Sequence, residues 1–80
     1  MIDPGQIKGW IEGGLACEHV EVAGDGHHFE AVVVSPAFRG KSRVQCHQLV
    51  YSALGARMAG EVHALSMKTY APEEWAARHG

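Results

Sequence analysis

The feature that most constrains the fold is a long helical stretch between two short segments with strand character. Residues 29–34 are rich in β-branched side chains, and residues 62–70 contain a run of alternating side chains. Between them, residues 42–58 repeat apolar side chains at helical spacing, and Ser42 and Gln45 have the spacing of a capping box. A helix that connects two neighbouring strands is a crossover, so these strands are predicted to be parallel, with a right-handed connection.

Two details of this helix follow from its sequence. The side chains predicted to share its inward face recur every three or four positions: His47, Val50, Tyr51, Leu54 and Met58. Gly55 lies inside this repeat, and glycine destabilises a helix interior by about 1 kcal/mol relative to alanine. The helix is therefore expected to bend or break at Gly55.

The other segments complete the predicted order of elements. A helix is predicted to start at residues 3–6, where Asp3 can cap, Pro4 suits the first helical position and Gln6 stands where the partner in a capping box belongs. Residues 19–22 alternate like a strand, and the glycine-rich residues 24–26 form a turn before the strand at 29–34, which predicts an antiparallel hairpin. Residues 72–75 open a last short helix, with two acidic side chains in its first turn.

These segments predict an α/β (α+β) fold in the order helix, strand, strand, helix, strand, helix. The three strands form a mixed sheet with helices on one face, and the other face is partly open. A length of 80 residues corresponds to one domain, residues 1–80, and a domain of this size has a thin core. A deep, closed active site is therefore not expected.

Composition and motifs exclude several classes of protein. The sequence contains no phosphate-binding P-loop, no HExxH and no GxSxG motif, so we expect no enzyme. No apolar run approaches the length of about 18 residues that a membrane span needs, and no secretory signal is recognised. Cys17 and Cys46 form no dense disulfide pattern, which favours thiols in a reducing cytoplasm, although a bridge between them stays open.

The charge is unevenly distributed along the chain. The formal net charge is −2, yet no acidic residue occurs between Glu30 and Glu61. This stretch contains the basic residues Arg39, Lys41, Arg43 and Arg57. Such asymmetry can mark an anionic partner, but four basic residues are more simply explained as the solvated side of a helix.

Histidine is unusually frequent, with six in 80 residues. If the strands at 29–34 and 62–70 are parallel neighbours, His28 and His63 lie at the same end of the sheet. Two imidazoles supply part of a metal site but cannot close a tetrahedral zinc site, so other ligands would come from Cys17, water or another protein. Spacing alone favours a structural role for both. For His47 we expect packing against the sheet and a hydrogen bond from its ring to a main-chain carbonyl.

The chain resembles the BolA family over nearly its whole length. The matching motifs are Val33-Val34-Ser35, Phe38-x-Gly40-Lys41, His47-x-x-Val50-Tyr51-x-x-Leu54, His63-Ala64-Leu65-Ser66 and Pro72-x-Glu74-Trp75. The opening Ile2-Asp3-Pro4 and the turn Gly24-Asp25-Gly26 look like the short-loop bacterial branch of that family. The resemblance implies a BolA-like fold similar to a type II KH domain.

The resemblance also implies a function as a non-enzymatic partner of monothiol glutaredoxins of the CGFS type, in iron–sulfur or iron homeostasis and stress response. In such complexes a [2Fe-2S] cluster is shared with glutaredoxin and its glutathione. The implied ligands from this chain are His63 and His28, with His27 as the less favoured neighbour. Alone, the chain is expected to be a monomer or a weak homodimer.

Two alternatives remain at this point. Some family members are described as DNA-binding transcriptional regulators, and Arg39, Lys41 and Arg43 would then contact nucleic acid. The segment Gly40-Lys41-Ser42-Arg43 lacks the second glycine of a KH loop, and Cys46 replaces an arginine that is common in the family, which weakens this reading. The other alternative is a regulatory module that binds no cluster.

Overall fold

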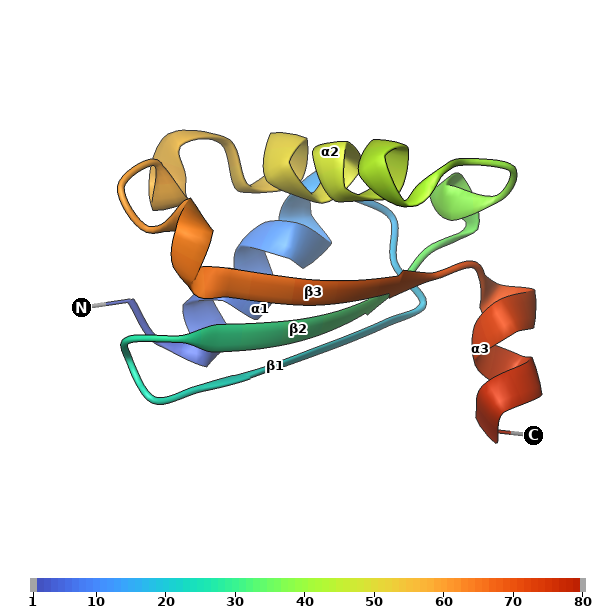
Figure 1. The fold of residues 1–80 in the computed structure, drawn as a ribbon, viewed down its shortest axis with the longest axis horizontal. Coiled ribbons are helices and arrows are strands. Elements are labelled where there is room, and N and C mark those ends of the chain that lie inside the picture. Colours follow the sequence, from blue (N-terminus) through green and yellow to red (C-terminus); the bar gives the residue numbers. More distant parts are fainter. Residues whose placement is uncertain (1, 80) are drawn as a thin grey trace.

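The computed structural model describes residues 2–79 and confirms the predicted order of elements (Figure 1). The main elements are α1 (Pro4–Gly14), β1 (His19–Gly24), β2 (Phe29–Val34), α2 (Arg43–Leu54), β3 (Leu65–Tyr70) and α3 (Pro72–His79). Three short 3-10 turns connect them: η1 (Pro36–Phe38), η2 (Gly55–Met58) and η3 (Val62–Ala64).

The sheet has the predicted mixed topology, with strand order β1-β2-β3. β1 and β2 form an antiparallel hairpin in which His19 lies opposite Val34. β2 and β3 are parallel, with Phe29 opposite Leu65 and Val34 opposite Tyr70. The starts of β2 and β3 therefore lie at one end of the sheet, and their ends lie at the other.

The core lies between the sheet and the two longer helices, which cover the same face of the sheet (Figure 1). The sheet contributes the buried side chains Val20, Phe29, Ala31, Val33 and Leu65, and the helical segments contribute Ile7, Ile11, Cys46, Val50, Leu54 and Met58. Burial of one large aliphatic side chain stabilises the fold by about 1.5–3 kcal/mol. The alternating apolar side chains of the strands and the helically spaced apolar side chains of α1 and α2 thus pack into a single apolar layer.

Both predicted capping boxes are present. The Asp3 carboxylate accepts the N–H of Gln6 at 3.0 Å, and the Gln6 side chain accepts the N–H of Asp3 at 2.9 Å. At the start of α2, Ser42 Oγ accepts the N–H of Gln45 at 3.2 Å and Gln45 Oε1 accepts the N–H of Ser42 at 2.9 Å. These pairs satisfy backbone donors that an α-helix leaves unbonded in its first turn.

The end of α2 confirms one prediction and corrects another. The helix ends at Leu54, and Gly55 adopts a positive φ of 60°, which glycine tolerates at little cost. The predicted inward face was wrong at Tyr51, which is 39% exposed, whereas Cys46 and Ala53 are buried. Ala53 is packed closely against the end of α1, so the face of α2 that points inward is turned away from Tyr51.

The third helix lies apart from the other two, at the end of the sheet where β3 ends (Figure 1), and its Trp75 covers the sheet face opposite the core. The Trp75 ring stacks on His19 with a centroid distance of 5.1 Å, and its centroid is 5.4 Å from that of Tyr70. His19, Val34 and Tyr70 are aligned across the three strands. This cover explains why Val34 is only 1% exposed although it points away from the main core.

Two further expectations concern membranes and disulfides. No helix within residues 2–79 is long and apolar enough to cross a membrane. Cys17 is half-buried, Cys46 is buried, and both are free thiols rather than a disulfide. The reading of Cys46 as a small buried hydrophobic residue is confirmed by its 5% exposure.

The close approach of α1 and α2 gives a test of this packing. A Cβ atom at Gly14 would lie 2.8 Å from Ala53 Cα, whereas a Cβ atom at Gly13 would have no neighbour within 4 Å. We expect Gly14→Ala to lower the free energy of unfolding by about 1–3 kcal/mol because the helices must move apart. Gly13→Ala, the matched control, is expected to be neutral or to raise it by up to about 1 kcal/mol. Urea unfolding measures both, and equal effects would contradict the packing described here.

Candidate functional site

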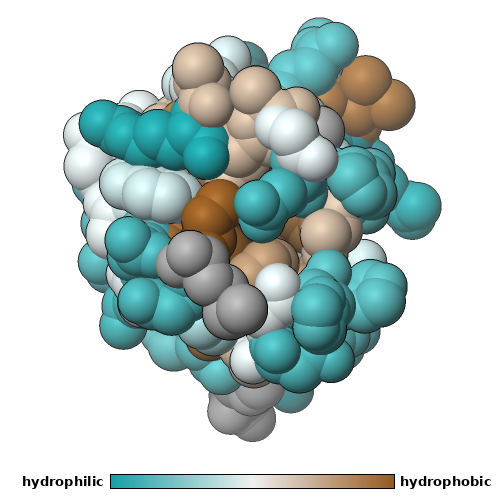
Figure 2. Space-filling model, turned by 90° about the vertical axis from the view of Figure 1, so that its left-hand side faces the viewer, coloured by the Kyte–Doolittle hydropathy of each residue, from teal (hydrophilic) through white to brown (hydrophobic). Residues whose placement is uncertain are grey.

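Three exposed histidines lie at the end of the sheet where β2 and β3 begin; His27, His28 and His63 are called the histidine edge below. His28 directly precedes β2, and His63 lies in η3, two residues before β3. Since Phe29 pairs with Leu65 in the parallel register, the sequence expectation that His28 and His63 share one end of the sheet is confirmed. Figure 2 faces this end of the molecule, where hydrophilic residues surround a small hydrophobic area.

Asp25 fixes the backbone of the histidine-bearing turn. Its Oδ1 accepts the N–H of His27 at 2.8 Å and that of His28 at 2.9 Å. The backbone N–H of Asp25 donates to the carbonyl of His28 at 3.2 Å, which closes the turn. The hydrogen bonds from His28 and His27 hold the pKa of the Asp25 carboxyl below its ordinary value. Asp25 is not predicted as a site residue from the sequence alone, although aspartate between two glycines is a common turn signal.

The backbone beneath His63 is also held by short-range bonds. The N–H of Glu61 donates to the carbonyl of Met58 at 2.9 Å, and the N–H of Ala64 donates to the carbonyl of Glu61 at 2.9 Å. Met58 is buried in the core and anchors this turn from below. His63 is thus an exposed side chain on an ordered backbone, as His28 is.

The chain does not supply a complete metal site from the residues described. Among residues 2–79 there is no group of three or more histidine, cysteine, aspartate or glutamate side chains that could hold a metal ion. Cys17, considered from sequence as a further ligand, precedes β1 at the opposite end of the sheet, because β1 runs antiparallel to β2. Burial, and to a smaller extent Glu12, raises the pKa of its thiol, which disfavours the thiolate that metals bind. Additional ligands for the histidine edge would come from another molecule.

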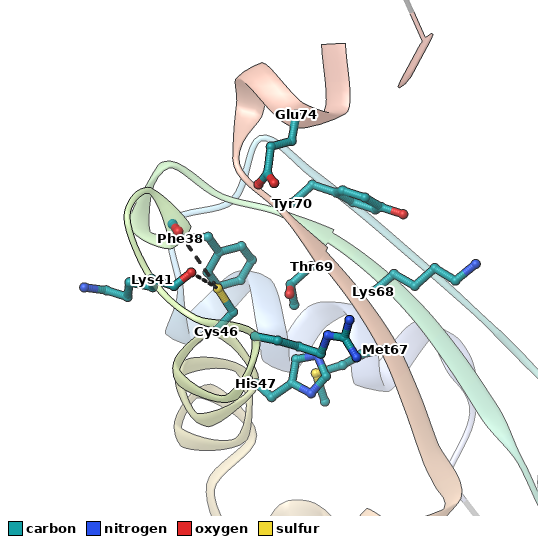
Figure 3. Close-up of a pocket in the computed structure, with 10 residues that line it drawn as sticks. Phe38, Lys41, Cys46, His47, Met67, Lys68, Thr69, Tyr70 and Glu74 are labelled. Carbon is teal, nitrogen blue, oxygen red and sulfur yellow. Dashed lines mark hydrogen bonds between the residues drawn. The ribbon is translucent and has the colours of Figure 1, made fainter. Parts of the chain in front are cut away.

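A second candidate site, called the basic groove below, lies at the other end of β3 (Figure 3). Its volume is about 540 Å³, and it lies between the start of α2 and the end of β3. Its lining comprises Phe38, Lys41, Arg43, Cys46, His47, Met67, Lys68, Thr69, Tyr70 and Glu74. Lys41 and Arg43 were predicted from sequence as nucleic-acid contacts, but Lys68 was not, because only the folded chain brings β3 beside the start of α2.

The interior of the basic groove is mixed in character. Figure 3 shows Lys41 and Lys68 extending away from each other on opposite sides, with Cys46 and Met67 between them. Cys46 Sγ lies 3.9 Å from the carbonyl oxygen of Phe38 and 4.0 Å from that of Lys41, so the thiol is turned toward the loop before α2. The groove therefore combines apolar side chains with cations on two sides and one carboxylate, that of Glu74.

The structure places Arg39 differently from the other two predicted nucleic-acid contacts. Its Nε donates to Glu73 Oε1 at 2.7 Å, and the two side chains form an exposed ion pair between the connector and α3. This contact raises the pKa of Arg39 and lowers the pKa of Glu73. Arg39 does not line the groove and is already bound to a carboxylate of this chain.

His47 also differs from its expected setting. It is half-buried and lines the basic groove, as a side chain packed near the sheet would. The predicted hydrogen bond to a main-chain carbonyl is absent, since no hydrogen bond joins the His47 ring to any other residue from 2 to 79. The ring faces the groove instead (Figure 3).

Comparison with known proteins places these features in a family. A family model described as BolA-like protein matches residues 13–74. Over 72 residues the chain is 40% identical to the acid stress protein IbaG of Escherichia coli strain K12, covering 89% of this chain and 86% of the relative. Over 57 residues it is 39% identical to the DNA-binding transcriptional regulator BolA of the same strain, covering 71% of this chain and 54% of that protein.

The fold agrees with this assignment. A BolA protein homologue from Coxiella burnetii matches the structure with a TM-score of 0.85 at 51% identity, covering 95% of this chain and 99% of that one. The predicted resemblance is therefore confirmed in both sequence and structure. With a family match over most of its length and the architecture of a solved homologue, this chain belongs to the BolA family.

Proposed function

We propose that this chain is a non-enzymatic partner of a monothiol CGFS glutaredoxin and that His63 and His28 are its ligands to a shared [2Fe-2S] cluster. The observation that carries the proposal is the parallel register of β2 and β3, which sets both histidines at one end of the sheet. Both side chains are exposed on ordered backbone and are therefore open to a partner surface.

The donor set fits a shared cluster better than a metal ion bound by this chain alone. Among the described residues no third side chain joins the two imidazoles to form a metal-binding group, so the remaining ligands would be the thiolates of glutaredoxin and glutathione. Replacing two thiolates by neutral imidazoles on one iron raises the reduction potential of such a cluster. The residues of this chain would then tune the cluster as well as hold it.

Single substitutions of the two histidines test this assignment. We expect the protein to change the visible absorption and circular dichroism of a cluster-loaded CGFS glutaredoxin, and His63→Ala to abolish that change because one ligand is lost. His28→Ala is expected to reduce or abolish it as well. His47→Ala, at the other end of β3, is the matched control and should leave the change intact. A spectral change that persists in His63→Ala would contradict the proposal.

The turn that carries His28 should loosen in acid. The lowered pKa of Asp25 means that its carboxylate stabilises the turn fully above the ordinary value of 3.8 and loses this effect as the pH falls through the lowered pKa. We expect amide-exchange protection at His27 and His28, measured by NMR, to follow this loss in the wild-type protein. Asp25→Ala should lose protection at every pH. Asp25→Asn, which keeps an oxygen acceptor but does not titrate, should retain it in acid; equal protection in all three would contradict the role of Asp25.

A second candidate function is nucleic-acid binding through the basic groove. Its support is the presence of Lys41, Arg43 and Lys68 around one open groove. One relative carries the name of a DNA-binding transcriptional regulator. Lysine and arginine contacts to phosphates supply affinity without sequence specificity, and such affinity falls steeply with salt.

Charge-neutralising substitutions test this second function. We expect Lys41→Gln/Arg43→Gln to weaken the binding of a short DNA duplex and to reduce the slope of log affinity against log salt by about 2, because two phosphate contacts are lost. Lys8→Gln/Arg57→Gln changes the net charge equally at positions outside the groove and serves as the control. Fluorescence anisotropy over a salt series measures both, and identical slopes for the two double variants would exclude the groove.

A further inference from the structure

We propose that the acidic first turn of α3 is an internal competitor that limits nucleic-acid binding by the basic groove. This inference rests on the second candidate function described above. The acidic turn consists of Glu73, which is paired with Arg39 of the connector before α2, and Glu74, which lines the basic groove. Both carboxylates therefore lie close to cations that a phosphate of the nucleic acid would contact.

Each carboxylate already occupies part of the basic surface. Glu73 Oε1 accepts a hydrogen bond from Arg39 Nε at 2.7 Å and so binds the one predicted cation that does not line the groove. Glu74 lines the groove itself, and its Oε1 accepts the N–H of Ala71 at 2.8 Å, which keeps the side chain directed back over the strand end (Figure 3). Carboxylates and phosphates are bound by arginine and lysine in the same way. The carboxylates of Glu73 and Glu74 therefore repel the phosphates of a nucleic acid and compete with them for the cations of this surface.

Besides the ion pair of Glu73 with Arg39 and the hydrogen bond from Ala71 to Glu74, ring contacts of other residues hold α3 on the sheet. Trp75, the next residue along α3, stacks on His19 and lies against Tyr70. The guanidinium of Arg78 lies over the Tyr70 ring at 5.2 Å from its centroid. These ring contacts fix α3 on the sheet independently of Glu73 and Glu74. We therefore expect α3 to stay docked when the two charges are removed.

The proposed occupant of the basic groove is a nucleic-acid backbone rather than an acidic protein segment. Lys41 and Lys68 stand on opposite sides of an open groove, Arg43 belongs to the first turn of α2, and Arg39 lies beyond the rim. Cations on several elements around an open groove suit an extended polyanion, and the name of one relative, a DNA-binding transcriptional regulator, favours a nucleic acid as that polyanion. Release of Arg39 from Glu73 would add one more cation that can contact a phosphate.

The test removes the two carboxylate charges while keeping the side-chain shapes. We expect Glu73→Gln/Glu74→Gln to bind a short fluorescein-labelled DNA duplex about three- to tenfold more tightly than the wild-type protein. Glu12→Gln/Glu61→Gln changes the net charge equally at exposed positions outside the groove, and we expect less than about twofold from it, because distant surface charges are screened by salt. Thermal unfolding and near-ultraviolet circular dichroism of both variants check that α3 stays docked.

The outcomes separate this inference from the function on which it rests. If Lys41→Gln/Arg43→Gln leaves wild-type DNA affinity unchanged, or if no variant binds DNA, the nucleic-acid function of the groove and this inference fail together. If that variant weakens binding but Glu73→Gln/Glu74→Gln tightens it no more than the control does, the inference alone is overturned. Tightening toward a poly-glutamate peptide but not toward DNA would also overturn it, in favour of an acidic protein partner.

Discussion

The parallel pairing of β2 with β3 is the constraint on which the rest of the structure depends. A parallel neighbour requires the chain to return to the starting end of the sheet, and α2 is the element that makes this return. The return buries one side of α2 against the sheet and completes the core around Val50 and Leu54. The same pairing brings the starts of two strands together at one end and sets the end of β3 beside the start of α2 at the other.

The two candidate sites therefore occupy opposite ends of one strand. The six residues of β3 span about 17 Å at the usual rise per residue. His63 precedes this strand, whereas Tyr70 at its end lines the basic groove. A partner bound at the histidine edge and a polyanion in the groove would thus contact different surfaces. The family assignment is common to both proposals, and the side chains that distinguish them do not overlap.

Local sequence patterns predicted those parts of the fold that depend on neighbours in the chain. The capping boxes at Asp3 and Ser42, the hairpin and the break at Gly55 are all decided within a few residues, and all are confirmed. The inward face of α2 was predicted wrongly at Tyr51. A helical repeat gives the period of burial, but the exact rotation of the helix depends on the close contact with α1, which local sequence does not encode.

The candidate sites were predictable to a similar extent. Once the strands were taken as parallel, the positions of His28 and His63 followed from strand order alone. The roles of Lys68 and Arg39 did not, because one depends on the approach of β3 to α2 and the other on an ion pair between residues 34 positions apart. Asp25 was missed for a different reason. The turn around it is predictable from local sequence, but the hydrogen bonds from the backbone of His27 and His28 to its carboxylate are visible only in the structure.

The pairing of β3 also bears on the order in which the chain acquires its structure. The hairpin of β1 and β2 closes a short loop, whereas the pairing of β3 with β2 closes a loop that contains the whole α2 segment, and closing a longer loop costs more entropy and is slower. We therefore expect β3 to join the sheet after the hairpin, and β3 is the strand that both candidate sites require. During synthesis or refolding, a chain whose hairpin has formed but whose β3 is still unpaired has neither site, so recognition by either kind of partner reports the completed fold.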